Sequence, residues 1–447
     1  MSVPDTLVRL GSRASRAADA EYRLGAKAAH LARARAAGLP VLPGWVVPAT
    51  LAGPALAAGA AAVRGDKPAA ARRAVLTHPF DPALTDALSE AAARLGGRVI
   101  VRSSSPLEAD ARWSGAFSSV SEVRADEVGA AVRSCWASAF AVDPLERLEA
   151  CGLNPAALSL AALIQPEIVP ESGGLARLVD GTVIVEGVAG HPGALLSGWA
   201  EAAVGHGLDD LAGPKVVAQV EDLAAATWRA TGDDVIEWAA DSGGVWLLQA
   251  RRSGPARALA EPAPADPASA DPASADTASV DTALSGPALA DPALADPVFA
   301  GRLLDALCQV DRPADPAGRV RWMPFIAAVV LARGKRVAAA PAAPGVGAGR
   351  LVPCTAHTRR PADYSGAILL VDRPVPALAP LLFSARGVIA RTGGAGSHLA
   401  EVARSLGVPM VTACRPDGVL GPEQPSADGT WIAALDGSRG EVALFRR

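Results

Sequence analysis

The sequence has few aromatic residues and no excess of either charge. Aromatic residues make up 4% of the 447 residues, and 42 basic residues are balanced by 46 acidic ones. Proteins that bind nucleic acids commonly carry a strongly basic patch and aromatic side chains that stack on bases. The composition gives no indication of such a surface, so we expect no nucleic acid partner.

Cysteine is also scarce, with five residues far apart in the sequence and no Cys-x-x-Cys pair. An odd number of widely spaced cysteines is typical neither of a disulfide framework nor of a zinc site. The amino terminus lacks the basic segment and apolar run of a signal peptide. We therefore expect reduced thiols and a cytoplasmic protein.

Long apolar runs and two common catalytic motifs are missing as well. The stretch Met323–Ala332 contains Pro324 and is shorter than the roughly 20 residues that span a bilayer, so it predicts a buried helix and no membrane association. Neither Gly-x-x-x-x-Gly-Lys-[Ser/Thr] nor Gly-x-Ser-x-Gly occurs. These absences exclude a P-loop ATPase and give no support to a serine hydrolase.

A low-complexity segment divides the chain. From about Glu261 to Asp296 the sequence repeats Ala-Asp-Pro-Ala-Ser, and repeated proline and aspartate predict a disordered, extended tether without a core. The remaining sequence, with 50% hydrophobic residues overall, is long enough for two or three domains. We predict an amino-terminal domain at 1–255, the tether at 256–297, a helical connector at 298–343, and a carboxy-terminal domain at 344–447.

The amino-terminal part mixes predicted strands and helices, which favours an α+β domain. Short β-rich runs predict strands, and apolar residues at helical spacing predict helices, the first closed by a glycine and a proline. The predicted strands are 99–101, 163–164, 182–185 and 245–248, and the predicted helices are 26–37, 126–140 and 215–228.

The carboxy-terminal part predicts a compact α/β unit. Between two of its predicted strands, Leu399, Val402, Ala403 and Leu406 form one apolar stripe of a helix that spans 397–406. The predicted strands are 367–371, 387–390, 410–413 and 431–435, preceded by connector helices at 298–309 and 321–337.

The run Gly393–Pro409 places a histidine where a glycine-rich turn becomes a helix. Glycines permit positive φ angles, and the first amides of a helix favour an anion. The neutral imidazole of His398 supplies a nitrogen nucleophile at pH 7. This position therefore suits a histidine that carries a phosphoryl group.

The same run keeps every fixed position of the pattern Gly-Gly-x-x-Ser-His-x-Ala-x-x-Ala-Arg-x-x-Gly-x-Pro. It thereby resembles the mobile phosphohistidine domain of phosphoenolpyruvate synthase, pyruvate phosphate dikinase and rifampin phosphotransferase. Segments 345–350 and 436–442 resemble the first and last hairpins of that domain, whereas Gly396 stands where the family usually has threonine. The resemblance implies a small β/β/α swivelling domain with His398 as a catalytic residue.

The amino-terminal part resembles the ATP-grasp-like nucleotide-binding domain of the same family. Leu24–Ala29 resembles its opening motif and Val101–Glu108 its Val-Arg-Ser-Ser segment. By this resemblance, Lys27 and Arg102 are catalytic residues that bind the ATP phosphates. The family has Glu-Asp where this chain has Glu108 followed by alanine, and Asp110 is the nearest acidic residue that could replace the missing one.

Further segments resemble the family's nucleotide-binding loop and paired strands. The segments that contain Cys135 and Gln165 match landmarks that we interpret mainly as core packing. In one of the paired strands the family's aspartate is replaced by Val235, and Asp234 lies one position away, where only a bulge could bring it to the same face. The resemblance implies that Gly115, Gln165, Glu237, Gln249 and Arg251 bind ATP, with Glu237 and Gln249 also holding Mg²⁺.

The family reaction transfers a pyrophosphoryl group from ATP to histidine, releases AMP, and passes phosphate to an acceptor. The stretch 298–343 is too short for an acceptor barrel of about 250 residues. Three alternatives remain: an enzyme that phosphorylates a hydroxyl or amine of a small molecule in specialised metabolism, one subunit of a split system like phenylphosphate synthase whose acceptor site lies on a partner protein, or a nucleotide-binding regulatory protein without turnover.

Overall fold

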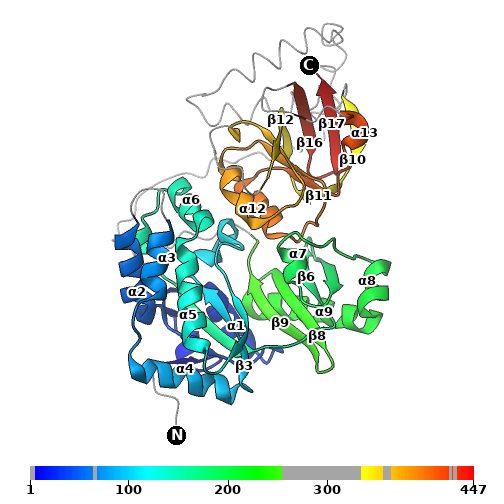
Figure 1. Ribbon diagram of the computed structural model, residues 1–447. Coiled ribbons are helices and arrows are strands. Elements are labelled where there is room, and N and C mark those ends of the chain that lie inside the picture. The colour runs from blue at the N-terminus through cyan, green and yellow to red at the C-terminus, as the bar shows by residue number, and fades with distance from the viewer. Residues whose placement is uncertain are drawn as a thin grey trace, which may run out of the picture.

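A computed structural model of the chain describes residues 6–63, 68–253, 334–355, 364–421, 425 and 430–446. The predicted tether at 256–297 and the predicted connector residues 298–333 lie outside these ranges. The described residues form three β-sheets with helices packed against them, so the chain is a mixed α/β protein of several domains (Figure 1).

The first sheet is antiparallel, with the strand order β1-β2-β5-β3-β4. Its inner strands are rich in valine, isoleucine and leucine, and they bury Val99, Val101 and Ile164 against helices that carry Trp136. The strands are β1 (Val8–Arg9), β2 (Trp45–Val47), β3 (Arg98–Ser104), β4 (Val120–Arg124) and β5 (Ala161–Pro166). The helices before and between them are α1 (Ala20–Ala36), α2 (Ala49–Ala62), α3 (Pro68–Leu76), α4 (Pro82–Arg94), α5 (Val128–Ala137) and α6 (Val142–Ala150).

The second sheet has four antiparallel strands in the order β7-β6-β8-β9. The long helix α9 (Pro214–Thr231) covers it, begins with proline and stops at Gly232, whose φ of 74° suits a glycine. The strands are β6 (Ser172–Val179), β7 (Thr182–Ala189), β8 (Val235–Asp241) and β9 (Gly244–Arg251). Two short helices, α7 (Gly193–Leu196) and α8 (His206–Ala212), lie beside them, as Figure 1 shows in green.

The third sheet has eight strands in the order β10-β17-β16-β12-β13-β14-β15-β11. Strands β12 to β15 run parallel to one another, and α12 (His398–Leu406) connects β14 to β15. The strands are β10 (Lys335–Ala338), β11 (Ala340–Ala343), β12 (Val346–Cys354), β13 (Ile368–Val371), β14 (Gly387–Ala390), β15 (Met410–Thr412), β16 (Trp431–Asp436) and β17 (Glu441–Arg446). A short helix, α13 (Asp417–Leu420), follows β15.

Several 3₁₀ turns complete the described structure. The turns that matter for the site are η2 and η3, which follow β3, and η10, which precedes β14 in the third sheet. The bounds of all the described 3₁₀ turns are η1 (Ala14–Arg16), η2 (Pro106–Ala109), η3 (Ala111–Trp113), η4 (Ser138–Phe140), η5 (Pro155–Ala157) and η10 (Pro376–Phe383).

The predicted connector is wrong where the structure describes it. Residues 335–338 and 340–343 are strands β10 and β11, which pair with β17 and β15 at the two edges of the third sheet. The helical prediction for 321–337 therefore fails at 335–337, and the carboxy-terminal sheet begins before residue 344. Because this segment is mostly alanine, its apolar pattern fits a helix or a strand, and pairing with the sheet decides between them.

Within the described residues, the other predicted strands and helices all occur, with ends displaced by a few residues. The predicted helices at 298–309 and 323–332 lie outside the described residues. Among the described helices, none is long and apolar enough to cross a membrane. Among the described cysteines, those at positions 135, 151 and 414 are free thiols.

Candidate active site

One cavity of about 230 Å³ brings together the predicted site residues from the first and second sheets and from helices α1 and α12. It is bordered by α1, β3, β8 and β9, by the loop that follows η3, and by the beginning of α12. In Figure 1, α12 lies at the edge of the third sheet that faces the two amino-terminal sheets. The predicted residues that line the cavity are Lys27, Arg102, Gly115, Gln165, Glu237, Gln249, Arg251 and His398.

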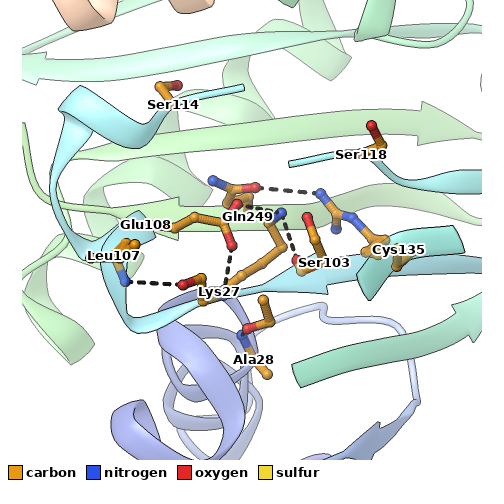
Figure 2. A network of polar contacts seen from close by, with 12 residues as sticks. Lys27, Ala28, Ser103, Leu107, Glu108, Ser114, Ser118, Cys135 and Gln249 are labelled. Carbon is orange, nitrogen blue, oxygen red and sulfur yellow. Dashed lines mark hydrogen bonds and ion pairs between the residues drawn. The ribbon is translucent and has the colours of Figure 1, made fainter. Parts of the chain in front are cut away.

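A kink in α1 positions Lys27. Gly25 has φ of 77°, and the helix that follows it lies directly on β3, where Ala28 donates its backbone N–H to the Ser104 hydroxyl at 3.0 Å. The Lys27 ammonium donates to the Ser103 carbonyl at 2.9 Å and pairs with Glu108 at 3.1 Å (Figure 2). Lys27 is thus a buried cation at the cavity wall whose charge is balanced by one carboxylate.

Arg102 projects from β3 toward the ends of β8 and β9. Its guanidinium donates to the Leu248 carbonyl and lies 3.5 Å from both the Glu237 carboxylate and the Gln249 amide oxygen. Burial lowers the pKa of Arg102, and the negative charges of Glu237 and Glu108 offset part of that effect. A buried cation held by only a few acceptors is suited to bind an anionic ligand.

Glu237 and Gln249 lie opposite each other on β8 and β9, so their side-chain oxygens share one face of the second sheet. A carboxylate and an amide oxygen are the hard donors that Mg²⁺ prefers. Two protein ligands suffice when phosphate oxygens and water supply the others, so this pair fits Mg²⁺ bound to a nucleotide. Among the described residues, no group of three or more His, Cys, Asp or Glu side chains is placed to hold a metal ion.

His398 is the first residue of α12, whose N-cap Ser397 accepts a hydrogen bond from the backbone N–H of Ala400 at 3.3 Å. Its Nδ1 atom lies 2.8 Å from the Ser114 hydroxyl and 3.5 Å from the Glu401 carboxylate. Glu401 in turn forms a buried ion pair with Arg251. Residues distant in sequence thus surround one histidine.

The charge of Arg251 controls the protonation of Glu401. Burial alone raises the pKa of this carboxyl group, but the positive charge of Arg251, with contributions from His398 and Arg404, outweighs burial and holds the pKa well below its ordinary value. Glu401 is therefore ionised at neutral pH. A buried ion pair of this kind needs both partners, because either charge alone would be left desolvated.

Gly115 and Gln165 occupy different parts of the cavity. Gly115 has φ of 66°, and a Cβ atom there would lie 2.8 Å from Cδ2 of His398, so the glycine allows the imidazole ring to pack against this loop. Gln165 is buried and donates its amide to the Leu42 carbonyl at 3.1 Å. The landmark around Cys135 and Trp136 is fully buried in the first core, which confirms its interpretation as core packing.

Asp110 and Asp234 lie next to the two positions where the family has an aspartate, but neither side chain reaches the cavity. Asp110 caps η3, binds Arg112, and accepts a hydrogen bond from Ser405 of α12 at 3.1 Å. Asp234 accepts hydrogen bonds from Ser253 at the end of the sheet. The bulge between β8 and β9 lies at Glu237 and Trp238, so it does not turn Asp234 toward the site.

Sequence reasoning missed three residues of this site. Ser114 and Glu401 lie inside the matched segments, but at positions without an assigned role. His191 also lines the cavity, and its Nδ1 accepts the backbone N–H of Gly193 at 3.0 Å. The pKa of His191 is lowered, chiefly by burial and then by the charge of Arg102. The only sequence signal for His191 is its position between the glycines of Gly190-His-Pro-Gly.

Three of the solved structures that match this chain do so with low TM-scores. Aconitase X of Thermococcus kodakaraensis and a UPF0107 protein are 14% and 12% identical to this chain, each covering 25% of it and 100% of themselves, with TM-scores of 0.20. D-alanyl-alanine synthetase A from Vibrio cholerae O1 biovar eltor is 10% identical over 52% of this chain and 55% of its own, with a TM-score of 0.27. These scores support no argument about the fold, and no curated protein sequence gives a significant match.

Two family descriptions match, one in each part of the chain. Residues 21–198 match the AMP/ATP-binding domain of pyruvate phosphate dikinase, and residues 364–440 match the mobile domain of PEP-utilising enzymes. The first match includes Lys27 of α1 and Arg102 of β3, and the second includes His398. A chain that combines an ATP-binding domain of this type with the mobile domain belongs to the phosphoenolpyruvate synthase and pyruvate phosphate dikinase family.

Proposed function

We propose that this protein is a dikinase-type phosphotransferase in which ATP phosphorylates His398 and the phosphohistidine then phosphorylates an acceptor. One observation carries the proposal: His398, from the mobile-domain match, lines the same cavity as Lys27 and Arg102 of the ATP-binding match. A nucleophile and a set of phosphate-binding cations in one cavity are the parts that phosphoryl transfer requires.

The cations are arranged to bind a polyphosphate chain. Lys27, Arg102 and Arg251 each lie beside a carboxylate, at distances of 3.1 Å for Lys27 and 3.5 Å for Arg102. A phosphate group that enters the cavity meets three buried cations. These side chains then bind and orient the phosphates and stabilise the negative charge of the transition state.

In the transfer step, a lone pair on the imidazole of His398 forms a bond to the β-phosphorus of ATP. The bond between this phosphorus and the oxygen that bridges to the α-phosphorus breaks, and AMP leaves with the electron pair. Glu237 and Gln249 would hold Mg²⁺, which neutralises phosphate charge when it is bound. Water then removes the outer phosphate, and the remaining phosphoryl group passes to a hydroxyl or amine acceptor in a small molecule or on a partner protein.

The test is to incubate the purified chain with Mg²⁺ and ATP labelled at the β-phosphate, without acceptor. We expect acid-labile label on His398 and AMP as the nucleotide product. Label that persists in His398→Ala, or ADP in place of AMP, would contradict the proposal. A panel of hydroxyl and amino compounds, scored by AMP release, then identifies the acceptor.

Two variants separate nucleotide binding from phosphoryl transfer. Arg102→Ala removes a cation from the cavity, so we expect weak ATP binding and no label. His398→Ala removes only the nucleophile, and calorimetry should show ATP affinity close to that of the unmodified chain. Equal loss of ATP affinity in both variants would show that this division of roles is wrong.

A further inference from the structure

The hydrogen bonds around His398 determine which of its nitrogens carries hydrogen, and this inference rests on the proposed function. Three groups meet at one side of the imidazole: Nδ1 of His398, the Ser114 hydroxyl at 2.8 Å, and the Glu401 carboxylate at 3.5 Å. The Ser114 hydroxyl also contacts Glu401 directly. The three groups therefore form a closed triangle of polar atoms.

Only one placement of the hydrogen atoms satisfies the donors and acceptors of this triangle. The Glu401 side chain is 2% exposed and ion-paired with Arg251, so its ionised carboxylate can only accept. The single hydrogen of the Ser114 hydroxyl therefore points to Glu401. The serine oxygen is then left to accept, which requires that Nδ1 of His398 carries the hydrogen and donates it.

We propose that Ser114 and Glu401 are positioning residues that hold His398 as the Nδ1–H tautomer and thereby make Nε2 the nucleophile. Within the described part of the chain, Nε2 makes no hydrogen bond, so its lone pair is free to attack phosphorus. The ring packs closely against Gly115, where a Cβ atom would lie 2.8 Å from Cδ2.

The two positioning residues belong to different parts of the molecule. Glu401 lies three residues after His398 in α12, so it remains beside the histidine wherever that helix lies. Ser114 and Arg251 belong to the amino-terminal sheets and their loops, and they meet Glu401 only when α12 lies against the cavity. The complete triangle therefore forms only at the position where ATP is the phosphoryl donor, whereas Glu401 accompanies the phosphohistidine to the acceptor.

This arrangement also balances the charge of the transfer step. The bond from Nε2 to phosphorus forms with the nitrogen lone pair, so the ring becomes positively charged while it keeps the hydrogen on Nδ1. The carboxylate of Glu401 faces that positive charge at 3.5 Å. When the phosphoryl group leaves, the electron pair returns to Nε2 and the neutral Nδ1–H tautomer is restored, so no proton needs to be moved.

The first measurement is nitrogen NMR of the full chain labelled with ¹⁵N-histidine, which distinguishes the two neutral tautomers without any reaction. We expect His398, assigned by its absence in His398→Ala, to be in the Nδ1–H form. Ser114→Ala and Glu401→Gln should give mixtures, because the first removes the bridging hydroxyl and the second supplies a donor as well as an acceptor. A dominant Nε2–H form in the unmodified chain would overturn the inference, even if His398 is phosphorylated.

The second measurement is the rate and position of labelling. Glu401→Gln should lower the labelling rate by about 10²-fold or more, as loss of a tautomer-fixing carboxylate does in other enzymes, while ATP affinity stays within about twofold of that of the unmodified chain. Ser114→Thr, which keeps the hydroxyl, should recover most of the rate lost in Ser114→Ala. Ser118→Ala is the control, since Ser118 lies on the same loop, is exposed, and does not line the cavity.

Failure of this inference differs from failure of the proposed function. Phosphorus NMR that finds the phosphoryl group on Nδ1, with AMP as product, would reject the inference and leave the proposed function intact. If neither AMP nor label forms, the proposed function fails, and the tautomer measurement still decides the inference. Labelling rates unchanged in both Ser114→Ala and Glu401→Gln would also reject it.

Discussion

Gly115 allows the imidazole of His398 to approach the loop that follows η3. A Cβ atom at this position would lie 2.8 to 3.1 Å from three ring or Cβ atoms of the histidine. Because both groups line the cavity, the glycine determines whether the proposed nucleophile fits there. The absence of one carbon atom is thus a condition for the proposed reaction.

We predict that Gly115→Ala lowers labelling of His398 by about 10²-fold, since displacing a nucleophile by about 1 Å has this effect. ATP affinity, measured by calorimetry, should change little because the cations remain in place. Gly181→Ala is the matched control: Gly181 also has positive φ, of 80°, but nothing lies near its Cβ position. Equal losses of labelling in both variants would point to backbone strain and against the contact with His398.

His30 gives a second prediction at this scale, outside the cavity. Its Nδ1 lies 2.8 Å from Asp233 and its Nε2 lies 3.3 Å from Glu21. Burial lowers the pKa of His30, but the hydrogen bonds to both carboxylates outweigh burial and raise the pKa above 6.5. For Glu21, the hydrogen bond from His30 is the main cause that lowers the pKa to about 2.

The direction of each pKa shift sets a pH range of stability. The contribution of His30 to the free energy of unfolding is complete below the ordinary histidine pKa of 6.5, and it is lost as pH rises through the raised pKa. The contribution of Glu21 is complete above its ordinary value of 4.5 and is lost as pH falls toward 2. At about pH 5.5, His30→Gln should lower the melting temperature by about 2–4 °C. A difference between variant and unmodified chain that stays constant up to about pH 9 would contradict this account.

Among the elements, α1 depends most on one backbone angle. Gly25 interrupts the helix with φ of 77°, and a Cβ atom there would overlap the backbone of Ser104 in β3. The close approach lets Ala26 donate its N–H to the Ser105 carbonyl at 3.1 Å. The kink therefore aims Lys27 at the cavity.

We predict that Gly25→Ala weakens ATP binding by about tenfold or more, because the strain and the overlap with β3 exceed about 1.4 kcal/mol. Gly53→Ala in α2 is the control, since no atom lies near its Cβ position. Calorimetry with ATP compares the two. An unchanged affinity in Gly25→Ala would mean that Lys27 does not need this kink.

At the scale of the whole molecule, Gly396 determines how α12 and its preceding loop lie on the second sheet. A Cβ atom at Gly396 would overlap Oε2 of Glu186 on β7. Glu186 is buried and pairs with Arg177 at 3.0 Å through its other oxygen, and Oε2 has no hydrogen-bond partner among the described residues. The glycine that replaces the family's usual threonine is therefore matched to a carboxylate on another sheet.

We predict that Gly396→Thr lowers labelling of His398 by about 10²-fold, and that adding Glu186→Ala restores a large part of it because the space is reopened. Glu186→Ala alone measures the cost of leaving Arg177 unpaired. ATP binding should be similar in all three variants. If the double variant is no better than Gly396→Thr, then Glu186 is not the group that excludes the threonine.

The sequence by itself determined the kinds of residues that we propose to carry the chemistry. The glycine-rich turn before His398, the arginine of β3 and the paired Glu237 and Gln249 are local patterns, and local patterns depend only on neighbouring residues. The regular strands were predicted for the same reason, since their β-branched runs stand out even in an alanine-rich chain. Strands β10 and β11 lack such runs, and only pairing with a distant strand makes them part of the sheet.

Only the tertiary structure decided which of these residues meet and how the histidine is held. Ser114 and Glu401 are separated by 287 positions, and Glu401 and Arg251 by 150, so no spacing rule could connect them. Position in the fold also removed Asp110 and Asp234 from the site, although each lies next to the position where the family has an aspartate. Hydrogen bonds and buried charges depend on distances in space, and those distances are fixed by the packing of three sheets around one cavity.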